Sequence, residues 1–371
     1  MTRRVIPILS FLVAAAPSFS WAQGAPAGAG GATAAAATAS ATSPTDDDDP
    51  EGRLVKKYPF RNSTFLWAQG LNALALDRGA ELTYNPSYSW LFRLQPRYYA
   101  TKQLNFRARI GLGIEWTNSD ETTAYHEPLW EDIWLDAVYT NLVTIPVVKI
   151  VVSPSFRFIL PASKASQARS LYMGLGPGLS LSRSFKLPKG MAIDLAYAFS
   201  FIKNLNKYST LQYDAPTIIT CNGAGGEDCG RFLHAGGRNP SMSFANTFVF
   251  DWTITKRFKF EALFGITNAL LYSLTPGSVT LAGGTVLDVA NDPNYNVNMR
   301  AAMVYGFELA FEAHPAVSIS FGTFTLNPQL REDSSYRAPF FNRFTEFSLS
   351  TTINLDRVVA GIHRRVKPSA Q

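Results

Sequence analysis

The chain has 371 residues, of which 34 are Lys or Arg and 28 are Asp or Glu, and 13% are aromatic. Low charge combined with many aromatic side chains excludes an extended disordered chain. A membrane-spanning helix needs about 18 or more consecutive apolar residues. The one candidate stretch, residues 5–16, is shorter, so a helical membrane protein is excluded too. The apolar residues must therefore be interleaved with polar ones.

The N-terminus has the order of a secretory signal peptide. Arg3 and Arg4 precede the apolar stretch, and Ser20, Trp21 and Ala22 form a cleavage site. We expect residues 1–22 to be removed on export, which leaves a net charge of 32 − 28 = +4. This charge is modest and lacks a Lys/Arg-rich block, so the sequence gives no support to nucleic-acid binding.

Residues 23–60 form a low-complexity segment rich in Ala, Gly, Thr and Asp, which includes an acidic run at residues 46–49. Such a composition is typical of a flexible linker. Without a rigid loop to converge the carboxylates, the acidic run predicts a solvated tether and no metal site.

From residue 61 onward the dominant signal has a period of two residues, as in β-strands with one apolar face. Between residues 103 and 116, for example, Leu104, Phe106 and Ile110 alternate with Asn105 and Arg107. The pattern predicts twelve strands, of which the first is the weakest: 62–76, 85–100, 103–117, 131–143, 147–160, 168–185, 190–203, 242–255, 257–273, 299–313, 316–327 and 342–355.

The connections between these segments alternate in length. Short ones fall near residues 101–102, 144–146, 187–189, 256 and 315, and longer ones near 118–130, 161–167, 204–241, 274–298 and 328–341. Long strands with short turns at one end and longer loops at the other are typical of transmembrane barrels, whereas a β-sandwich has shorter strands and no such rule for its loops. We therefore predict an all-β, antiparallel up-and-down transmembrane barrel of about twelve strands over residues 61–355, with short periplasmic turns and longer external loops. Residues 356–371 would form a basic periplasmic tail.

The two cysteines, Cys221 and Cys229, lie in the longest external loop. A flexible spacer separates them, and an exported chain meets oxidising conditions, so we predict a disulfide that staples this loop. A metal site would need two further soft ligands, and only His234 is near in sequence.

Taken together, the signal peptide, the linker and the train of long amphipathic strands resemble the β-barrel proteins of the Gram-negative bacterial outer membrane, with porin-like channels as the nearest functional group. The resemblance covers residues 62–355 and rests on architecture, not on a motif. It implies a location in the cell outer membrane, with membrane lipid and the outer-membrane assembly machinery as partners, and it carries over no functional residue. One departure is that many such barrels end on an aromatic residue, whereas this chain passes Ile353 and Leu355 and continues into a basic tail.

Residues of the parity opposite to the apolar face should point into the barrel. The inward basic residues predicted from the second, third and fifth segments are Arg93, Arg97, Arg107, Arg109, Lys149 and Arg157. The inward acidic residues predicted from the seventh to tenth and the twelfth segments are Asp194, Asp251, Glu261, Glu308, Glu312 and Glu346. Because strand order runs round the wall, the two sets would face each other across the interior. Asp132 and Asp136, on the fourth segment, break this division.

Two interpretations of the opposed charges compete. They either line water and set up a field that orients polar solutes, or they pair across a narrow interior and close it. Glycines at inward positions, Gly111, Gly113, Gly174, Gly176, Gly178 and Gly306, leave space and favour a narrow channel for passive diffusion of small polar solutes, without a cofactor. A closed structural, anchoring or secretion-partner barrel is the alternative, and the sequence leaves homo-oligomerisation open.

An outer-membrane lipid hydrolase is the less favoured alternative. Such an enzyme needs a nucleophile or a carboxylate within hydrogen-bond reach of a histidine. None of the four histidines falls on a predicted strand, and no nucleophile signature surrounds them. His126, with Glu127, Glu131 and Asp132 nearby in sequence, is the best candidate for acid–base or metal chemistry. The sequence therefore predicts neither an enzyme nor a metal site.

Overall fold

The computed structural model describes residues 59–73, 87–117, 125–209, 238–273, 278–280, 286–288, 298–328, 336–342 and 344–366. The predicted signal peptide, almost all of the linker, and the predicted disulfide between Cys221 and Cys229 lie outside these residues. The strands are β1 (Thr64–Asn72), β2 (Tyr88–Gln95), β3 (Arg97–Tyr99), β4 (Leu104–Glu115), β5 (Pro128–Trp130), β6 (Ile133–Tyr139), β7 (Val143–Ile145), β8 (Ile150–Leu160), β9 (Leu171–Lys186), β10 (Ala192–Asn206), β11 (Pro240–Thr253), β12 (Phe258–Leu271), β13 (Ser278–Thr280), β14 (Val286–Asp288), β15 (Met299–His314), β16 (Val317–Asn327) and β17 (Thr345–Asn354). The helices are α3 (Lys164–Ala168), the 3-10 turn η3 (Pro188–Gly190) and α5 (Leu355–Val366).

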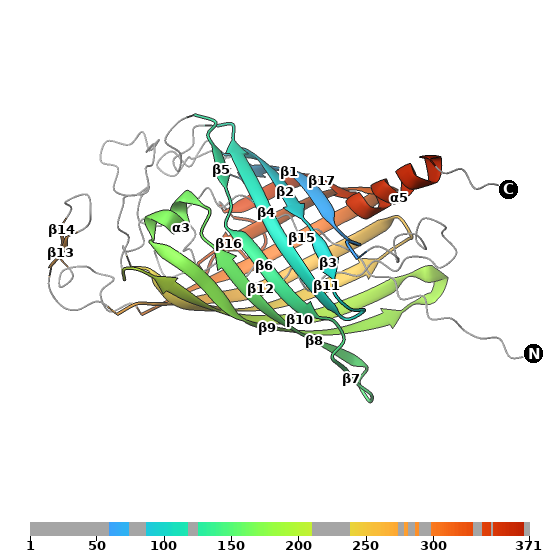
Figure 1. Ribbon diagram of the computed structural model, residues 1–371, viewed down its shortest axis with the longest axis horizontal. Coiled ribbons are helices and arrows are strands. Elements are labelled where there is room, and N and C mark those ends of the chain that lie inside the picture. Colours follow the sequence, from blue (N-terminus) through green and yellow to red (C-terminus); the bar gives the residue numbers. More distant parts are fainter. Residues whose placement is uncertain are drawn as a thin grey trace, which may run out of the picture.

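Twelve of these strands form one closed antiparallel barrel (Figure 1). The order round the wall is β1, β2, β4, β6, β8, β9, β10, β11, β12, β15, β16 and β17, and pairing of β1 with β17 completes the circle. Each long strand is thus paired with its neighbours along the chain, as an up-and-down barrel requires. All twelve predicted segments are confirmed, the weakest of them as β1, and the fold class is the predicted one.

The first and last strands place both described ends of the barrel on the same side. Thr64, at the start of β1, pairs with Asn354, at the end of β17. The short connections 187–191, 254–257 and 315–316 lie at this end as well, because each one joins a strand that ends here to the next strand, which begins here. The strand ends that the longer connections join lie at the other end, as the sequence predicted.

One short connection differs from its prediction. Residues 144–146 are expected as a tight turn, but residues 143–145 form β7, which pairs with the start of β8 and prolongs the hairpin beyond β6 (Figure 1). Every side chain from residue 141 to residue 149 is exposed. Asn141 and Lys149 both have positive φ, 56° and 52°, which marks the two bends of this arm.

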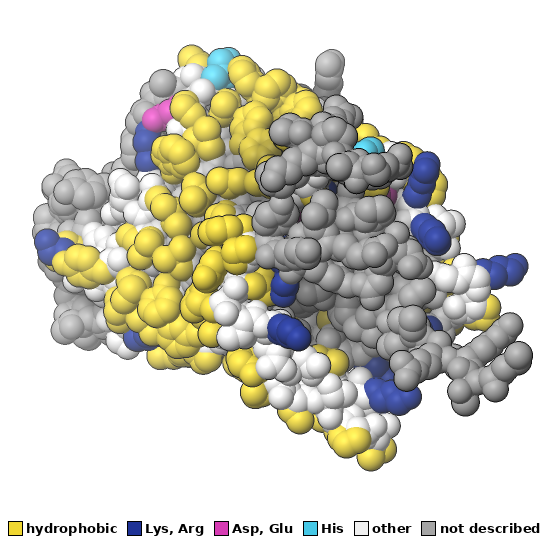
Figure 2. All heavy atoms as spheres, turned by 45° about the vertical axis from the view of Figure 1, so that its right-hand side comes forward, with side chains coloured by type: hydrophobic (Ala, Val, Ile, Leu, Met, Phe, Trp, Pro, Cys, Tyr) yellow, Lys and Arg dark blue, Asp and Glu magenta, His cyan; other side chains and the backbone are white. Residues whose placement is uncertain are grey.

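The distribution of polarity is inverted relative to a soluble protein. Large apolar side chains on the outer face of the barrel are exposed, for example Phe106 at 46% and Phe321 at 57%. Polar side chains on the inner face are buried, for example Arg93 at 1% and Asn105 at 0%. Figure 2 shows hydrophobic side chains spread over the wall. Water-soluble proteins bury apolar and expose charged residues, so this surface suits an apolar surrounding and a polar interior.

Two short helical elements flank the barrel. α3 lies in the connection between β8 and β9, and its N-cap Ser163 accepts a hydrogen bond from the backbone N–H of Ser166. α5 follows β17 directly, in the segment expected as a basic tail. Among the described residues, no helix is both long enough and apolar enough to cross a bilayer.

Candidate functional site

The interior of the barrel carries a basic wall, formed by inward side chains of β2, β3, β4 and β8. Arg93, Arg97 and Arg157 are buried, and Arg107 and Arg109 are half-buried. Their positions follow from the alternation of each strand, since successive side chains point to opposite faces. The structure thus places five of the six predicted basic residues inside the barrel.

A carboxylate near the external loops neutralises part of the basic wall. Glu131, between β5 and β6, accepts hydrogen bonds from Arg93 Nε at 2.9 Å and from Arg109 Nη2 at 3.2 Å. To reach Arg93 on β2, it must cross β4. Gly111 on β4 permits this, because a Cβ built there would lie 1.9 Å from Glu131 Oε2. The missing side chain of Gly111 is therefore space that Glu131 fills, not open lumen.

A second ion pair lies farther along the same wall. Arg157 on β8 donates to Asp136 on β6 in a bidentate arrangement, at 2.6 and 2.8 Å. The guanidinium groups of Arg109 and Arg157 both lie over the ring of Trp134, at 4.0 and 4.3 Å from its centroid. Arginines so placed are attracted by the aromatic face. Bidentate pairing and stacking together fix the direction of these cations.

An acidic row lies on the other side of the barrel. Asp194 on β10 is directly opposite Asp251 on β11, Asp251 is opposite Glu261 on β12, and Glu261 is opposite Glu308 on β15. We call these four residues the acidic row. Asp251 and Glu261 are hydrogen-bonded to each other, so these two carboxyl groups share a proton. Ionising all four groups would place like charges directly opposite each other, which is destabilising, and such a cost in stability is expected at functional sites.

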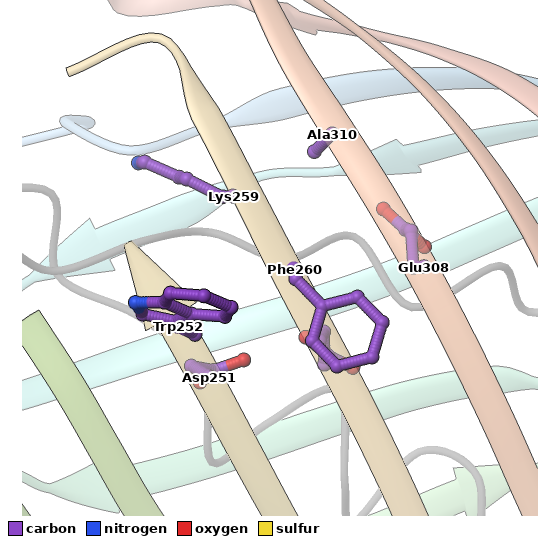
Figure 3. A pocket seen from close by; sticks show the side chains of 7 residues that line it. Asp251, Trp252, Lys259, Phe260, Glu308 and Ala310 are labelled. Atoms are coloured by element: carbon purple, nitrogen blue, oxygen red, sulfur yellow. The ribbon is translucent and has the colours of Figure 1, made fainter. Parts of the chain in front are cut away.

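Lys259 shares the wall of the acidic row. It lies two residues before Glu261 on the same face of β12 and interacts electrostatically with Glu312, Asp251 and Asp194. Figure 3 shows the recess at this point, with Trp252 and Phe260 on the near face of the sheet and Asp251 and Glu308 behind it. The carboxylates therefore point to the inside, while the aromatic rings point to the outside.

The order of strands places the two charged walls opposite each other. β4 and β12 are six strands apart in either direction round the barrel. The predicted division into a basic and an acidic half is thus present in the topology. Asp136, which broke that division in the sequence, belongs to the basic wall as the partner of Arg157.

The remaining predicted residues lie apart from these groups. Glu312 and Glu346 are half-buried, Glu312 toward the short-turn end and Glu346 toward the loop end. The prediction that Lys149 lines the lumen is wrong. This residue lies in the exposed turn of the β7–β8 arm and has a left-handed backbone conformation, because β8 begins only at Ile150.

Sequence reasoning missed apolar residues that share the interior with the charges. Val249, Leu263, Val304 and Phe324 form one buried inward cluster beside the acidic row. Two smaller inward clusters are Trp134 with Ile159 and Ile202, and Leu66 with Ala68 and Leu91. A signal existed for Trp134, because it shares its parity with Asp136. No signal existed for Glu131, whose parity in a continuous strand would point it outward.

The residues near His126 have separate structural roles. Asp132 accepts hydrogen bonds from the backbone N–H of Ser163 at 2.9 Å and from Ser166 Oγ at 2.5 Å, which fixes the start of α3. Glu127 forms an ion pair with Lys164, and the His126 ring lies against Trp116. Within the described part of the chain, no group of three or more His, Cys, Asp or Glu residues is arranged to hold a metal ion.

Several solved outer-membrane proteins are similar to this chain in structure. An outer-membrane channel from Pseudomonas putida F1 has a TM-score of 0.44 at 10% identity, with 80% of this chain and 96% of the channel covered. The NanC porin has a TM-score of 0.38 at 10% identity, with 78% and 98% covered. Omp33 of Acinetobacter baumannii has a TM-score of 0.30 at 8% identity, with 80% and 99% covered. No protein-family model and no curated protein matches the chain. The fold described above rests on the strand pairing of this chain itself.

Proposed function

We propose that this protein is an outer-membrane channel of a Gram-negative bacterium, through which small polar solutes diffuse passively. The observation that carries the proposal is a closed barrel with an apolar outer face and two opposed charged walls inside it. Transmembrane barrels have an outward apolar band and a polar interior, and rows of charged side chains set the selectivity of pores.

The direction of the ion pairs supports an open lumen. Arg157 and Asp136 are direct neighbours on β8 and β6, and Glu131 pairs with Arg93 and Arg109 over Gly111. These pairs run along one wall, between strands that are adjacent or separated by one, and do not bridge the barrel. The acidic row faces them from the opposite wall, so an ion or a dipolar solute between the walls experiences a transverse field.

The mechanism needs no cofactor and no turnover. A zwitterionic or dipolar solute would align its negative end with the arginines and its positive end with the acidic row. The inward apolar clusters beside these charges would contact the non-polar part of the solute. Selectivity would thus come from the transverse arrangement of charge.

Single-channel recording of the refolded protein in a planar bilayer tests this proposal. Ion selectivity is read from the reversal potential in a salt gradient, for the wild type and for Arg107→Ala combined with Arg109→Ala. We expect steady current whose selectivity moves toward cations in the variant, because two positive charges leave the basic wall. Absence of current from a folded, heat-resistant barrel would instead support a closed structural or anchoring barrel.

A further inference from the structure

α5 presents a stripe of apolar residues at the short-turn end of the barrel. Leu355, Val359 and Ile362 are spaced by four and three residues, so they lie on one side of the helix. Val359 is 48% and Ile362 56% exposed, and Val358 beside the stripe is 38% exposed. We call Leu355, Val359 and Ile362 the α5 stripe.

The adjoining side of the helix is anchored to the barrel. Asp356 accepts a hydrogen bond from the backbone N–H of Asn62 at 2.8 Å, and Ala360, one turn later, is fully buried. The backbone N–H of Leu355 donates to Ser63 O at 2.9 Å, which ties the start of α5 to the start of β1. These contacts fix the rotation of the helix about its axis, so the exposure of the stripe is a property of the packed structure.

The stripe points away from the lumen. Arg357 lies about 160° round the helix from Val359, at about 100° per residue. It is close enough to the inward Lys259 for an electrostatic interaction. The side carrying Arg357 therefore faces the barrel mouth, and the stripe faces outward. The exposed side chains of Phe60 and Tyr98 lie at the same end of the barrel, with their ring centroids 5.3 Å apart. Figure 1 shows α5 standing beside this end.

We propose that the α5 stripe docks into the periplasmic leaflet of the membrane that holds the barrel, at the boundary between headgroups and acyl chains, and that anionic phospholipid is the lipid it selects. The α5 stripe lies at the same end of the barrel as the exposed aromatic side chains of Phe60 and Tyr98. In the sequence from residue 355 to residue 367 there are four basic residues, Arg357, Arg364, Arg365 and Lys367, against the single acidic residue Asp356. Helices with an apolar stripe and basic neighbours bind anionic membrane surfaces in this way. The inference rests on the proposed membrane location but not on solute passage.

Nitroxide labels on single cysteines test the docking, in the full chain carrying Cys221→Ser and Cys229→Ser. The labelled variants are Val359→Cys and Ile362→Cys in the stripe, Arg357→Cys on the other side of the helix, and Leu349→Cys on the outer face of β17. The protein is refolded into phosphatidylethanolamine vesicles, with and without phosphatidylglycerol. Accessibility is then measured to oxygen, which partitions into lipid, and to a water-soluble nickel chelate.

We expect the labels at 359 and 362 to be accessible to oxygen and protected from nickel, as at 349, and the label at 357 to show the reverse. We also expect the nickel protection at 359 and 362 to increase with phosphatidylglycerol and to decrease in high salt. Nickel accessibility at 359 and 362, with 349 in lipid, would overturn the docking alone. Nickel accessibility at 349 would overturn the membrane location. Spin–spin broadening at 362 that disappears on dilution with unlabelled protein would show that a second copy covers the stripe, which also overturns lipid docking.

Discussion

At the scale of single residues, the absence of a side chain at Gly111 decides how two arginines inside the barrel are neutralised. Glu131 passes over this position and pairs with Arg93, whose side chain is fully buried, and with Arg109. A buried charge without a partner is strongly unfavourable. Glu131 is therefore expected to stabilise the loop end of the barrel much more than an exposed ion pair would.

Replacement of Glu131 by Gln is the corresponding test. It keeps the size of the side chain and removes its charge, so Arg93 and Arg109 lose their shared counterion. We expect the free energy of unfolding to fall by about 3 kcal/mol, measured by reversible urea unfolding in lipid vesicles. The matched control is Glu127→Gln, which removes an ion pair with Lys164, a side chain that is 42% exposed. We expect the free energy of unfolding of this variant to differ from that of the wild type by less than about 1 kcal/mol. Equal effects of the two variants would contradict a special role of Glu131.

At the scale of elements, the ladder between β9 and β10 has a close contact that only glycine tolerates. The regular pairing of the two strands is interrupted between two cross-strand pairs, Ser200 with Gly178 and Lys203 with Leu175. Between them, a Cβ on Gly176 would lie 1.9 Å from the backbone oxygen of Phe201. Backbone atoms of a closed barrel cannot move aside without breaking neighbouring pairs. Gly176 therefore maintains the pairing of these two strands.

We expect Gly176→Ala to lower the free energy of unfolding by roughly 3 kcal/mol, as overpacking against fixed atoms does. The control is Gly306→Ala, on the inner face of β15, where the nearest atom to a built Cβ lies at an ordinary 3.4 Å. We expect that variant to fold like the wild type. Both are compared by the temperature at which the folded form is lost in heat-modifiability gels. A wild-type transition for Gly176→Ala would show that the ladder can adjust at this point.

The same elements show what the sequence could and could not predict. The period of two residues located all twelve barrel strands, because one face of each meets lipid and the other the lumen. It placed Arg157 and Glu308 inside for the same reason. It failed at Lys149, since the β7–β8 hairpin is prolonged into an exposed arm and β8 begins one residue later, at Ile150. It failed at Glu131 as well, because two residues outside any strand separate β5 from β6 and reset the alternation.

The alternation of apolar and polar residues does not predict which residues of neighbouring strands contact each other. The alternation placed Asp194, Asp251, Glu261 and Glu308 on one face of their strands, but it did not fix their register. Only the pairing of β10, β11, β12 and β15 brings them into one row. Likewise, inward glycines predicted open space, yet Gly174 is packed by Ile159 and Ile202. One sequence shows which face a residue occupies, while tertiary pairing decides what it meets there.

At the scale of the whole molecule, two walls of opposite charge face each other across a closed barrel, and their effects on ion passage should have opposite signs. Neutralising part of the acidic row with Asp194→Asn and Asp251→Asn removes the negative charges of the two carboxylates of the row that interact with Lys259 and conserves side-chain size. The interaction energy of one fixed charge with a passing ion at about 4 Å in water is about 1 kcal/mol. We therefore expect the ratio of anion to cation permeability to rise several-fold. Reversal potentials in a salt gradient measure this change, and Glu127→Gln, outside the lumen, controls for charge removal as such. If removing the acidic pair moved selectivity toward cations, or left it unchanged while current persisted, ions would not pass along the acidic row.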